Sequence, residues 1–221
     1  MKLCLCRIFV KSINSTTQTS KSLDPNIILR ALGYIGVNPN DFNITFDMFE
    51  YHRSVLHGIG HVYRTMIACA LLGEKLHKSR DGFLAFCGAY IHDFARLNDD
   101  MDSNHGMRAA TYCFPKYMNL WKKYKLTNEE AQIICSAVSQ HSTCEWMRPL
   151  DRGYDVMAML KDADALDRCR FGETELDTNL LRFSQSRELI AMARLYCHHT
   201  LNLNEEITFQ AFIESCNKIK H

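Results

Sequence analysis

The chain has 221 residues, of which 47% are hydrophobic and 23% charged, with only 10 glycines and 4 prolines. This composition is typical of one globular domain and excludes a disordered or fibrous chain, and the scarcity of glycine and proline favours helix over sheet. We therefore expect an all-α protein. The formal net charge of +1 gives no broad basic field for a long nucleic acid, so the expected partner is a small anion.

The ten cysteines are dispersed along the chain. Several fall at apolar positions of predicted helices, where a free cysteine behaves as a small hydrophobe, and this pattern favours a reducing compartment. No run of residues approaches the ~18 consecutive apolar positions of a membrane span. We therefore expect a cytoplasmic protein with no membrane partner.

The N-terminal segment is predicted to lie outside the folded domain. Residues 1–11 contain an apolar run that Arg7 interrupts, and the run is too short for a secretory signal. Residues 12–22 are rich in serine and threonine, which is typical of a linker. We expect a tail and linker over residues 1–22 and one domain over residues 23–221.

Two helices are predicted at the start of the domain. Asp24 and Pro25 are typical of an N-cap and a first helical turn, and Gly33 is typical of the end of that helix. Apolar residues then recur at helical spacing over residues 54–72, which predicts a long amphipathic helix. On that helix His57 and His61 would share one face.

The later segments also show helical patterns. An apolar helix over residues 82–94 is predicted to end with a His-Asp pair, after which the acidic stretch 98–104 breaks the pattern and His105 opens another helix. Thr127 precedes two glutamates, as expected of a helix N-terminus. Further helices are predicted over residues 154–170, 186–199 and 205–219, with no strand pattern, repeat or second domain.

Several histidines and aspartates fall on successive predicted helices. Imidazole and carboxylate together suit iron, manganese, zinc or magnesium rather than a metal that prefers thiolates. Ligands in a helical bundle need no proximity in sequence, because inward-facing positions on successive helices meet in space. The candidate ligands are His61, His92, Asp93, His105, His141 and Asp164.

The order of these residues resembles the signature of the HD superfamily of metal-dependent phosphohydrolases, over residues 50–170. HVYRT from His61 resembles the HxxRV helix of that family, AYIHDFAR resembles its apolar run ending in HD, and KDADALDR resembles its ADxLD element. The resemblance implies a single-domain HD-fold helical bundle. In the last element it implies Asp164 as the ligand in preference to Asp162 and Asp167, with Asp162 as the alternative.

His105 and His141 sharpen the resemblance, because they fall where the dinuclear branch of the superfamily has its extra ligands. HD-fold diadenosine tetraphosphate hydrolases and HD-GYP phosphodiesterases are similar in this respect, although the GYP portion is absent here. The resemblance implies two divalent transition metal ions, iron or manganese, with zinc, cobalt, nickel or magnesium as alternatives. Asp93 would bridge them, His61 and Asp164 would bind one, and His105 and His141 the other.

Arg96 is the candidate catalytic partner of Asp93. It stands three residues after Asp93, where the related families often carry a lysine. A guanidinium group there would clamp a phosphate through two hydrogen bonds and offset charge in the transition state. The alternative is a surface ion pair with Asp99 or Asp100.

Three further residues are candidates for binding substrate. Arg64 and Arg168 lie close in sequence to the proposed ligands and would extend a phosphate-binding rim, unless they point to solvent. His57 lies one turn before His61 and would reach the substrate or support a ligand. For His57 a structural role in the core is the alternative.

The resemblance implies a phosphohydrolase that cleaves a phosphomonoester or phosphodiester bond of a small nucleotide or phosphorylated metabolite. The first alternative is a mixed-valent di-iron oxygenase of the HD fold, since such enzymes use the same ligand arrangement. The second is a nucleotide-sensing HD module without catalysis. Oxygen consumption with iron would indicate the first, and tight nucleotide binding without turnover the second. The oligomeric state stays open.

Overall fold

The computed structural model describes residues 24–52, 54, 56–172, 174–203 and 206–219. The predicted tail and linker, residues 1–22, lie outside these ranges. Within them all regular structure is helical and forms one domain, which confirms the all-α prediction. The helices are α1 (Ile27–Tyr34), α2 (Ile59–Lys75), α3 (Ser79–Ile91), α4 (His105–Arg108), α5 (Met118–Lys123), α6 (Asn128–Gln140), α7 (Tyr154–Leu166), α8 (Ser184–Glu188), α9 (Ile190–Thr200) and α10 (Phe209–Asn217).

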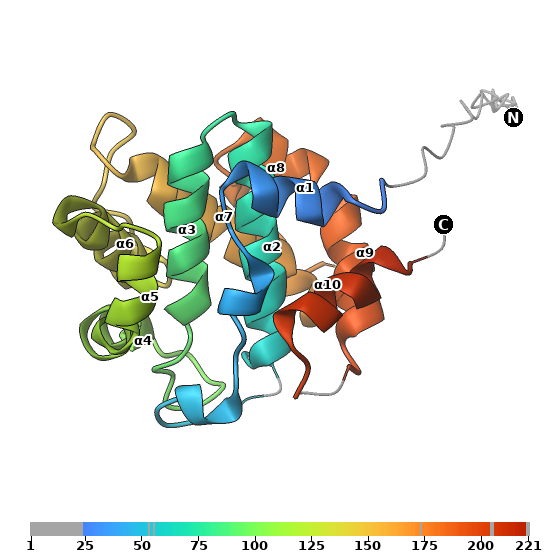
Figure 1. Ribbon diagram of the computed structural model, residues 1–221, viewed down its shortest axis with the longest axis horizontal. Coiled ribbons are helices and arrows are strands. Elements are labelled where there is room, and N and C mark those ends of the chain that lie inside the picture. Colours follow the sequence, from blue (N-terminus) through green and yellow to red (C-terminus); the bar gives the residue numbers. More distant parts are fainter. Residues whose placement is uncertain (1–23, 53, 55, 173, 204–205, 220–221) are drawn as a thin grey trace, which may run out of the picture.

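The two central helices, α2 and α3, lie side by side in the middle of the molecule (Figure 1). The prediction that α2 is amphipathic was wrong, because only Gly60, Glu74 and Lys75 of this helix are not buried. Neighbouring helices cover it on several sides: α1, α3, α7 and α9 all pack against it. A helix enclosed in this way is apolar nearly all round.

The start of α2 also differs from the prediction. Gly58 takes an extended backbone conformation and precedes the first helical residue, Ile59, so the helix begins later than residue 54. His57 therefore lies in the segment before α2 and does not share a helical face with His61. The two imidazole rings still approach each other, with 5.9 Å between their centroids.

A glycine pair fixes the packing of α2 against α3. A Cβ atom added to Gly73 would lie 2.8 Å from the Cα atom of Gly82, and a Cβ added to Gly82 would lie 2.6 Å from the Cα of Gly73. Both distances are too short for any side chain, so the helix backbones touch at this end. This contact fixes how α2 and α3 lie against each other. The candidate ligands that they carry are near their other ends.

The N-terminus of α6 confirms the prediction from Thr127. The Thr127 side chain accepts a hydrogen bond from the Glu130 backbone N–H at 3.2 Å, and the Glu130 carboxylate accepts one from the Thr127 backbone N–H at 2.9 Å. These two bonds form a capping box, which satisfies backbone donors that a helix leaves free.

Replacement of Thr127 by Ala is expected to lower the free energy of unfolding by about 1 kcal/mol, because one end of the capping box is lost. Urea unfolding followed by circular dichroism measures the difference. The matched control is Thr111→Ala, because the exposed Thr111 hydroxyl donates only to the Met107 carbonyl oxygen within its own helical segment. An unchanged midpoint for Thr127→Ala would contradict a stabilising role for this cap.

The peripheral helices complete the bundle around this centre. In Figure 1, α4, α5 and α6 lie on one side of α3, whereas α9 and α10 lie on the other side of α2. Helix α5 was not predicted, and the segment predicted over residues 186–199 is divided between α8 and α9. Among the described residues, no helix is both long and apolar enough to cross a lipid bilayer.

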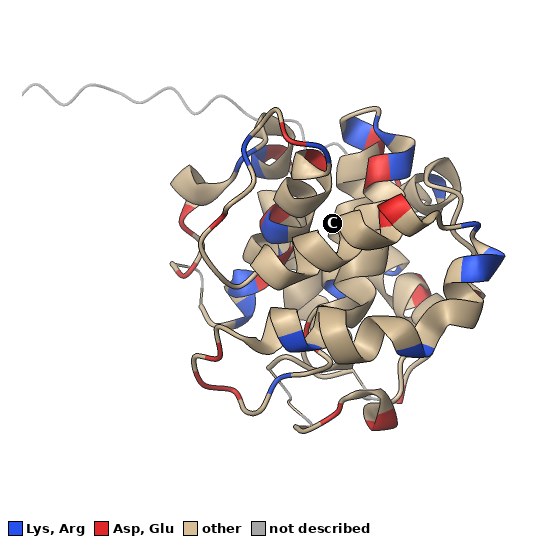
Figure 2. Cartoon of the chain, turned by 90° about the vertical axis from the view of Figure 1, so that its left-hand side faces the viewer, with Lys and Arg blue, Asp and Glu red and all other residues tan. Residues whose placement is uncertain are grey.

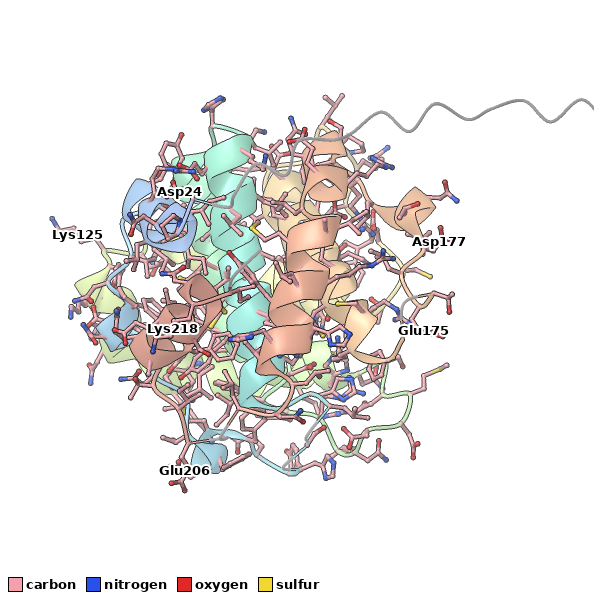
Figure 3. The ribbon with its side chains drawn as sticks, turned by 90° about the vertical axis from the view of Figure 1, so that its right-hand side faces the viewer. Asp24, Lys125, Glu175, Asp177, Glu206 and Lys218 are labelled. Atoms are coloured by element: carbon pink, nitrogen blue, oxygen red, sulfur yellow. The ribbon has the colours of Figure 1, made fainter. Side chains whose placement is uncertain are left out.

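Charged residues of both signs lie on the periphery of the described part of the chain. Figure 2 shows acidic and basic positions interspersed on the side that it displays. In Figure 3 the labelled acids Asp24, Glu175 and Asp177 and the labelled lysine Lys125 lie near the edges of the molecule. This distribution agrees with the near-zero net charge.

Candidate metal centre

The fold brings the predicted ligands together from five helices. Five of the six side chains are buried, and Asp164 is partly exposed. All six lie at or near helix ends: His61 at the start of α2, His92 and Asp93 directly after α3, His105 at the start of α4, His141 directly after α6, and Asp164 in the last turn of α7.

One group of atoms surrounds the Nε2 atom of His61. This atom lies 3.1 Å from Nε2 of His92, 3.3 Å from Oδ2 of Asp93 and 3.4 Å from Oδ1 of Asp164. Nε2 of His92 lies 3.6 Å from the same oxygen of Asp93. Two imidazole nitrogens and two carboxylate oxygens therefore converge.

A second group lies on the other oxygen of Asp93. Oδ1 of Asp93 lies 3.0 Å from Nε2 of His105 and 3.8 Å from Nε2 of His141. The two histidine nitrogens are 2.8 Å apart. Asp93 thus presents a separate oxygen to each of two groups.

The Nδ1 atoms of three of the histidines face backbone carbonyl groups. In His92, His105 and His141 the Nδ1 atom contacts the carbonyl oxygen three residues earlier in the chain, at 2.7 Å for His92 and 2.6 Å for His141. A carbonyl oxygen only accepts hydrogen bonds, so Nδ1 carries the proton. With the proton on Nδ1, the atom left to bind a metal is Nε2, which points into the cluster, as in a metal-ligating histidine.

The fourth histidine, His61, is held by a carboxylate. Its Nδ1 atom lies 2.7 Å from Oδ2 of Asp167. The same carboxylate accepts two hydrogen bonds from Arg64, at 2.5 and 3.0 Å. Burial would raise the pKa of Asp167, but the charge of Arg64 and the hydrogen bond from His61 outweigh burial, so the pKa lies far below its ordinary value. Asp167 thus remains ionised and orients His61.

These contacts distinguish the three acids of the ADxLD-like element. Asp164 alone among them contacts Nε2 of His61, whereas Asp167 is behind that ring on Nδ1. Asp162 faces elsewhere: its oxygens accept from the backbone N–H groups of Arg182 and Phe183. The geometry therefore agrees with the preference for Asp164 as the candidate ligand.

Burial and charge set the protonation states of the cluster. Burial lowers the pKa of His92 to about 3, so this ring is neutral at neutral pH. Burial would raise the pKa of Asp93, but the surrounding imidazoles outweigh it and lower the pKa well below its ordinary value. Neutral imidazole and ionised carboxylate are the states in which both groups bind a cation.

A cavity of about 580 Å³ opens onto the cluster. Four of the six candidate ligands line it, namely Asp93, His105, His141 and Asp164. A small molecule in this cavity would therefore reach the cluster directly. Its volume is in the range of pockets that bind small ligands and cofactors.

Arg96 lies beside the cluster, as the sequence predicts. Its guanidinium group is 3.8 Å from Oδ1 of Asp93 and donates to the backbone carbonyl oxygens of Asn98 at 3.2 Å and Asp100 at 2.8 Å. The side chain is 10% exposed, so the alternative of a surface ion pair with a neighbouring acid was wrong. Backbone carbonyls hold the cationic group at the cavity wall.

The other predicted substrate groups differ in position. Arg168 is exposed and lines the cavity, and its Nε donates to the Glu175 carbonyl oxygen at 3.1 Å. His57 also lines the cavity, with Nδ1 2.9 Å from Oδ1 of Asp99. Burial lowers the pKa of His57 to about 4, so the ring is neutral.

Arg64 is not at the cavity. Its guanidinium group is buried in the ion pair with Asp167 and donates to the Thr200 hydroxyl at 2.9 Å. The prediction that Arg64 binds substrate is therefore corrected: all three of its guanidinium nitrogens are engaged inside the protein. Its position favours a supporting role behind His61.

Several residues line the cavity without having been predicted from the sequence, among them Arg170 and Phe171. The Arg170 guanidinium group lies over the Phe171 ring at 4.2 Å and donates to the Asp167 carbonyl oxygen at 3.1 Å. Its Nε atom is buried and has no hydrogen-bond partner among the described residues. The turn after α7 brings Arg170 back to the cavity, and no sequence motif indicates that position for Arg170.

No protein-family model matches the chain, and neither a curated protein nor a solved structure matches it. The class of site is therefore defined by geometry: a helical domain with clustered histidine and aspartate side chains compatible with a metal site.

Proposed function

We propose that this protein is a metal-dependent phosphohydrolase of the HD type with a dinuclear centre. One contact pattern supports the proposal above all: each oxygen of Asp93 faces its own pair of histidine Nε2 atoms. A carboxylate between two pairs of imidazoles provides the ligands of a two-metal site. The order of the ligand motifs agrees with the HD signature.

The donor set fits divalent iron or manganese. It consists of imidazole nitrogens and carboxylate oxygens without a thiolate, and such sets suit borderline and hard cations. Two such cations, when bound, activate a water molecule and stabilise the negative charge of a phosphoryl group during its displacement. The open cavity gives substrate access to the ligands.

The residues of this chain would orient a phosphorylated substrate. Arg96 would donate to a phosphate oxygen, because its guanidinium group is held at the cavity wall beside Asp93. Arg170 lines the same cavity and would add positive charge there. Arg168 lies on the exposed rim. Because five aspartates line the cavity beside these three arginines, we expect an anionic substrate to be attracted by the arginines together with the bound cations.

The direct test is turnover of a panel of dinucleoside polyphosphates, cyclic dinucleotides and nucleoside phosphates, with Mn²⁺ or Fe²⁺ added under anaerobic conditions. Hydrolysis of at least one class, detected by chromatography, is the expected result. Metal-loaded protein that hydrolyses none of them would contradict the proposal. Oxygen consumption with iron would then favour the di-iron oxygenase, and nucleotide binding without turnover would favour the sensor.

Replacement of His141 by Ala is expected to lower the metal content from about two ions per chain to about one, because in the proposed centre this side chain and His105 bind the same ion. Elemental analysis after metal loading measures the ratio. His199→Ala is the control, because His199 is exposed on α9 and away from the cavity. Equal metal content in the two variants would exclude His141 as a ligand.

A further inference from the structure

Two cysteines lie beside Asp167, outside the six proposed ligands. Cys169 belongs to η5 (Asp167–Arg170), the short turn after α7, and Cys197 belongs to α9, which packs against that turn. The two Sγ atoms and a carboxylate oxygen of Asp167 all lie within 4.8 Å of one another. Figure 3 shows the molecule from the side on which α9 runs beside α2.

This group does not suit a metal ion. The oxygens of Asp167 already accept hydrogen bonds from Arg64 and His61. Without Asp167, two thiols remain, whereas a structural zinc site takes four protein ligands. The chemistry left to the pair is a bond between the two sulfur atoms.

We propose that Cys169 and Cys197 form a reversible disulfide that links η5 to α9. Both thiols are free in this structure, and their Sγ atoms lie within 4.8 Å, so a change of side-chain rotamers and a small backbone shift would bring them to the bond length of about 2.05 Å. Cys169 is partly exposed, which gives a small oxidant access to the pair.

The reaction is an exchange with a low-molecular-weight disulfide such as oxidised glutathione. One cysteine thiolate attacks the external disulfide and releases one glutathione, and the second cysteine then displaces the other. The two cysteines lose two protons and two electrons, and the oxidised glutathione gains both and becomes two thiols. Cys169, the more exposed of the two, is the thiol that attacks the external disulfide, and Cys197, which is buried, completes the internal bond.

Other cysteines of the chain provide contrasts. Cys69 and Cys87 are fully buried, and burial raises their pKa values well above the ordinary range, so neither thiol is reactive. Cys144 is exposed and belongs to no cysteine pair found among the described residues, so it would retain glutathione. Only a close pair with access to solvent releases both glutathione molecules.

The test uses the full chain with Cys144→Ser, equilibrated in glutathione buffers from reducing to oxidising and then quenched with a thiol-blocking reagent. Cleavage before aspartates leaves residues 167–176 as a peptide that contains Cys169 alone. The expected result is a disulfide between this peptide and the peptide that carries Cys197. Fragmentation assigns the bond to Cys197 rather than Cys216, and dithiothreitol separates the two peptides. The readout needs neither metal nor substrate, so it is separate from the test of the hydrolase.

Two results would overturn the proposal. One is glutathione retained on Cys169 without the joined peptide at the oxidising end of the series. The other is complete reaction of both cysteines with the thiol-blocking reagent at every ratio of reduced to oxidised glutathione, which would mean that the pair stays reduced. A Cys169→Ser variant provides the reference, since it removes the joined peptide while Cys197 stays in place.

Discussion

Replacement of Asp93 by Asn is expected to remove both metal ions and the proposed turnover, while the helical fold persists. The carboxylate faces two groups of histidine nitrogens through separate oxygens, so one substitution affects both proposed sites. Asn keeps the shape but lacks the negative charge that offsets two cations. Because even supporting residues of metal sites change affinity by about 10- to 100-fold, we expect a loss of at least about 100-fold in metal affinity.

The measurement combines elemental analysis, a metal titration and circular dichroism. Asp100→Asn is the matched control, because Asp100 lines the same cavity and is not a proposed ligand. This control is expected to retain both ions. Full metal content in the Asp93 variant would remove the bridging role, and loss of helical structure would show that Asp93 acts mainly in folding.

Replacement of Asp167 by Asn is expected to destabilise the fold by roughly 3 to 5 kcal/mol, because it leaves the buried Arg64 guanidinium without its counter-ion. It also removes the carboxylate that orients His61, so metal affinity should fall by about 10- to 100-fold. Urea unfolding at neutral pH and a metal titration measure the two effects. Both would be small if Asp167 were only a surface acid.

The effect of Asp167 on stability depends on pH. Its pKa is depressed in the folded protein relative to about 3.9 in an unfolded chain, so its contribution is full above that value. The contribution is lost as the pH falls below about 4 toward the folded pKa. The difference between the unfolding free energies of wild type and Asp167→Asn should therefore shrink on acidification, and a difference that grows would contradict the ion pair.

Local signals in the sequence predicted those features that depend on a few neighbouring residues. The Thr127 cap forms from residues three positions apart, and the spacing of apolar residues located most of the helices. The convergence of the candidate ligands followed from their motif order. The start of α2 was misplaced, because apolar spacing continues through Gly58 although the backbone there is extended.

Tertiary packing decided the features that the sequence did not predict. Arg64 looked like a rim residue because it is near His61 in sequence, but its partner Asp167 comes from a distant turn. Arg170 reaches the cavity only because η5 turns back after α7. Proximity in sequence to a ligand therefore did not distinguish a residue that lines the cavity from one that supports the ligands from behind.

The most direct measurement of the central claim is anomalous diffraction from a crystal of the protein loaded with Mn²⁺ or Fe²⁺. The proposal predicts two anomalous peaks, one among His61, His92, Asp93 and Asp164 and the other among Asp93, His105 and His141. Metal found only elsewhere, for example beside Cys169 and Cys197, would contradict a dinuclear centre bridged by Asp93.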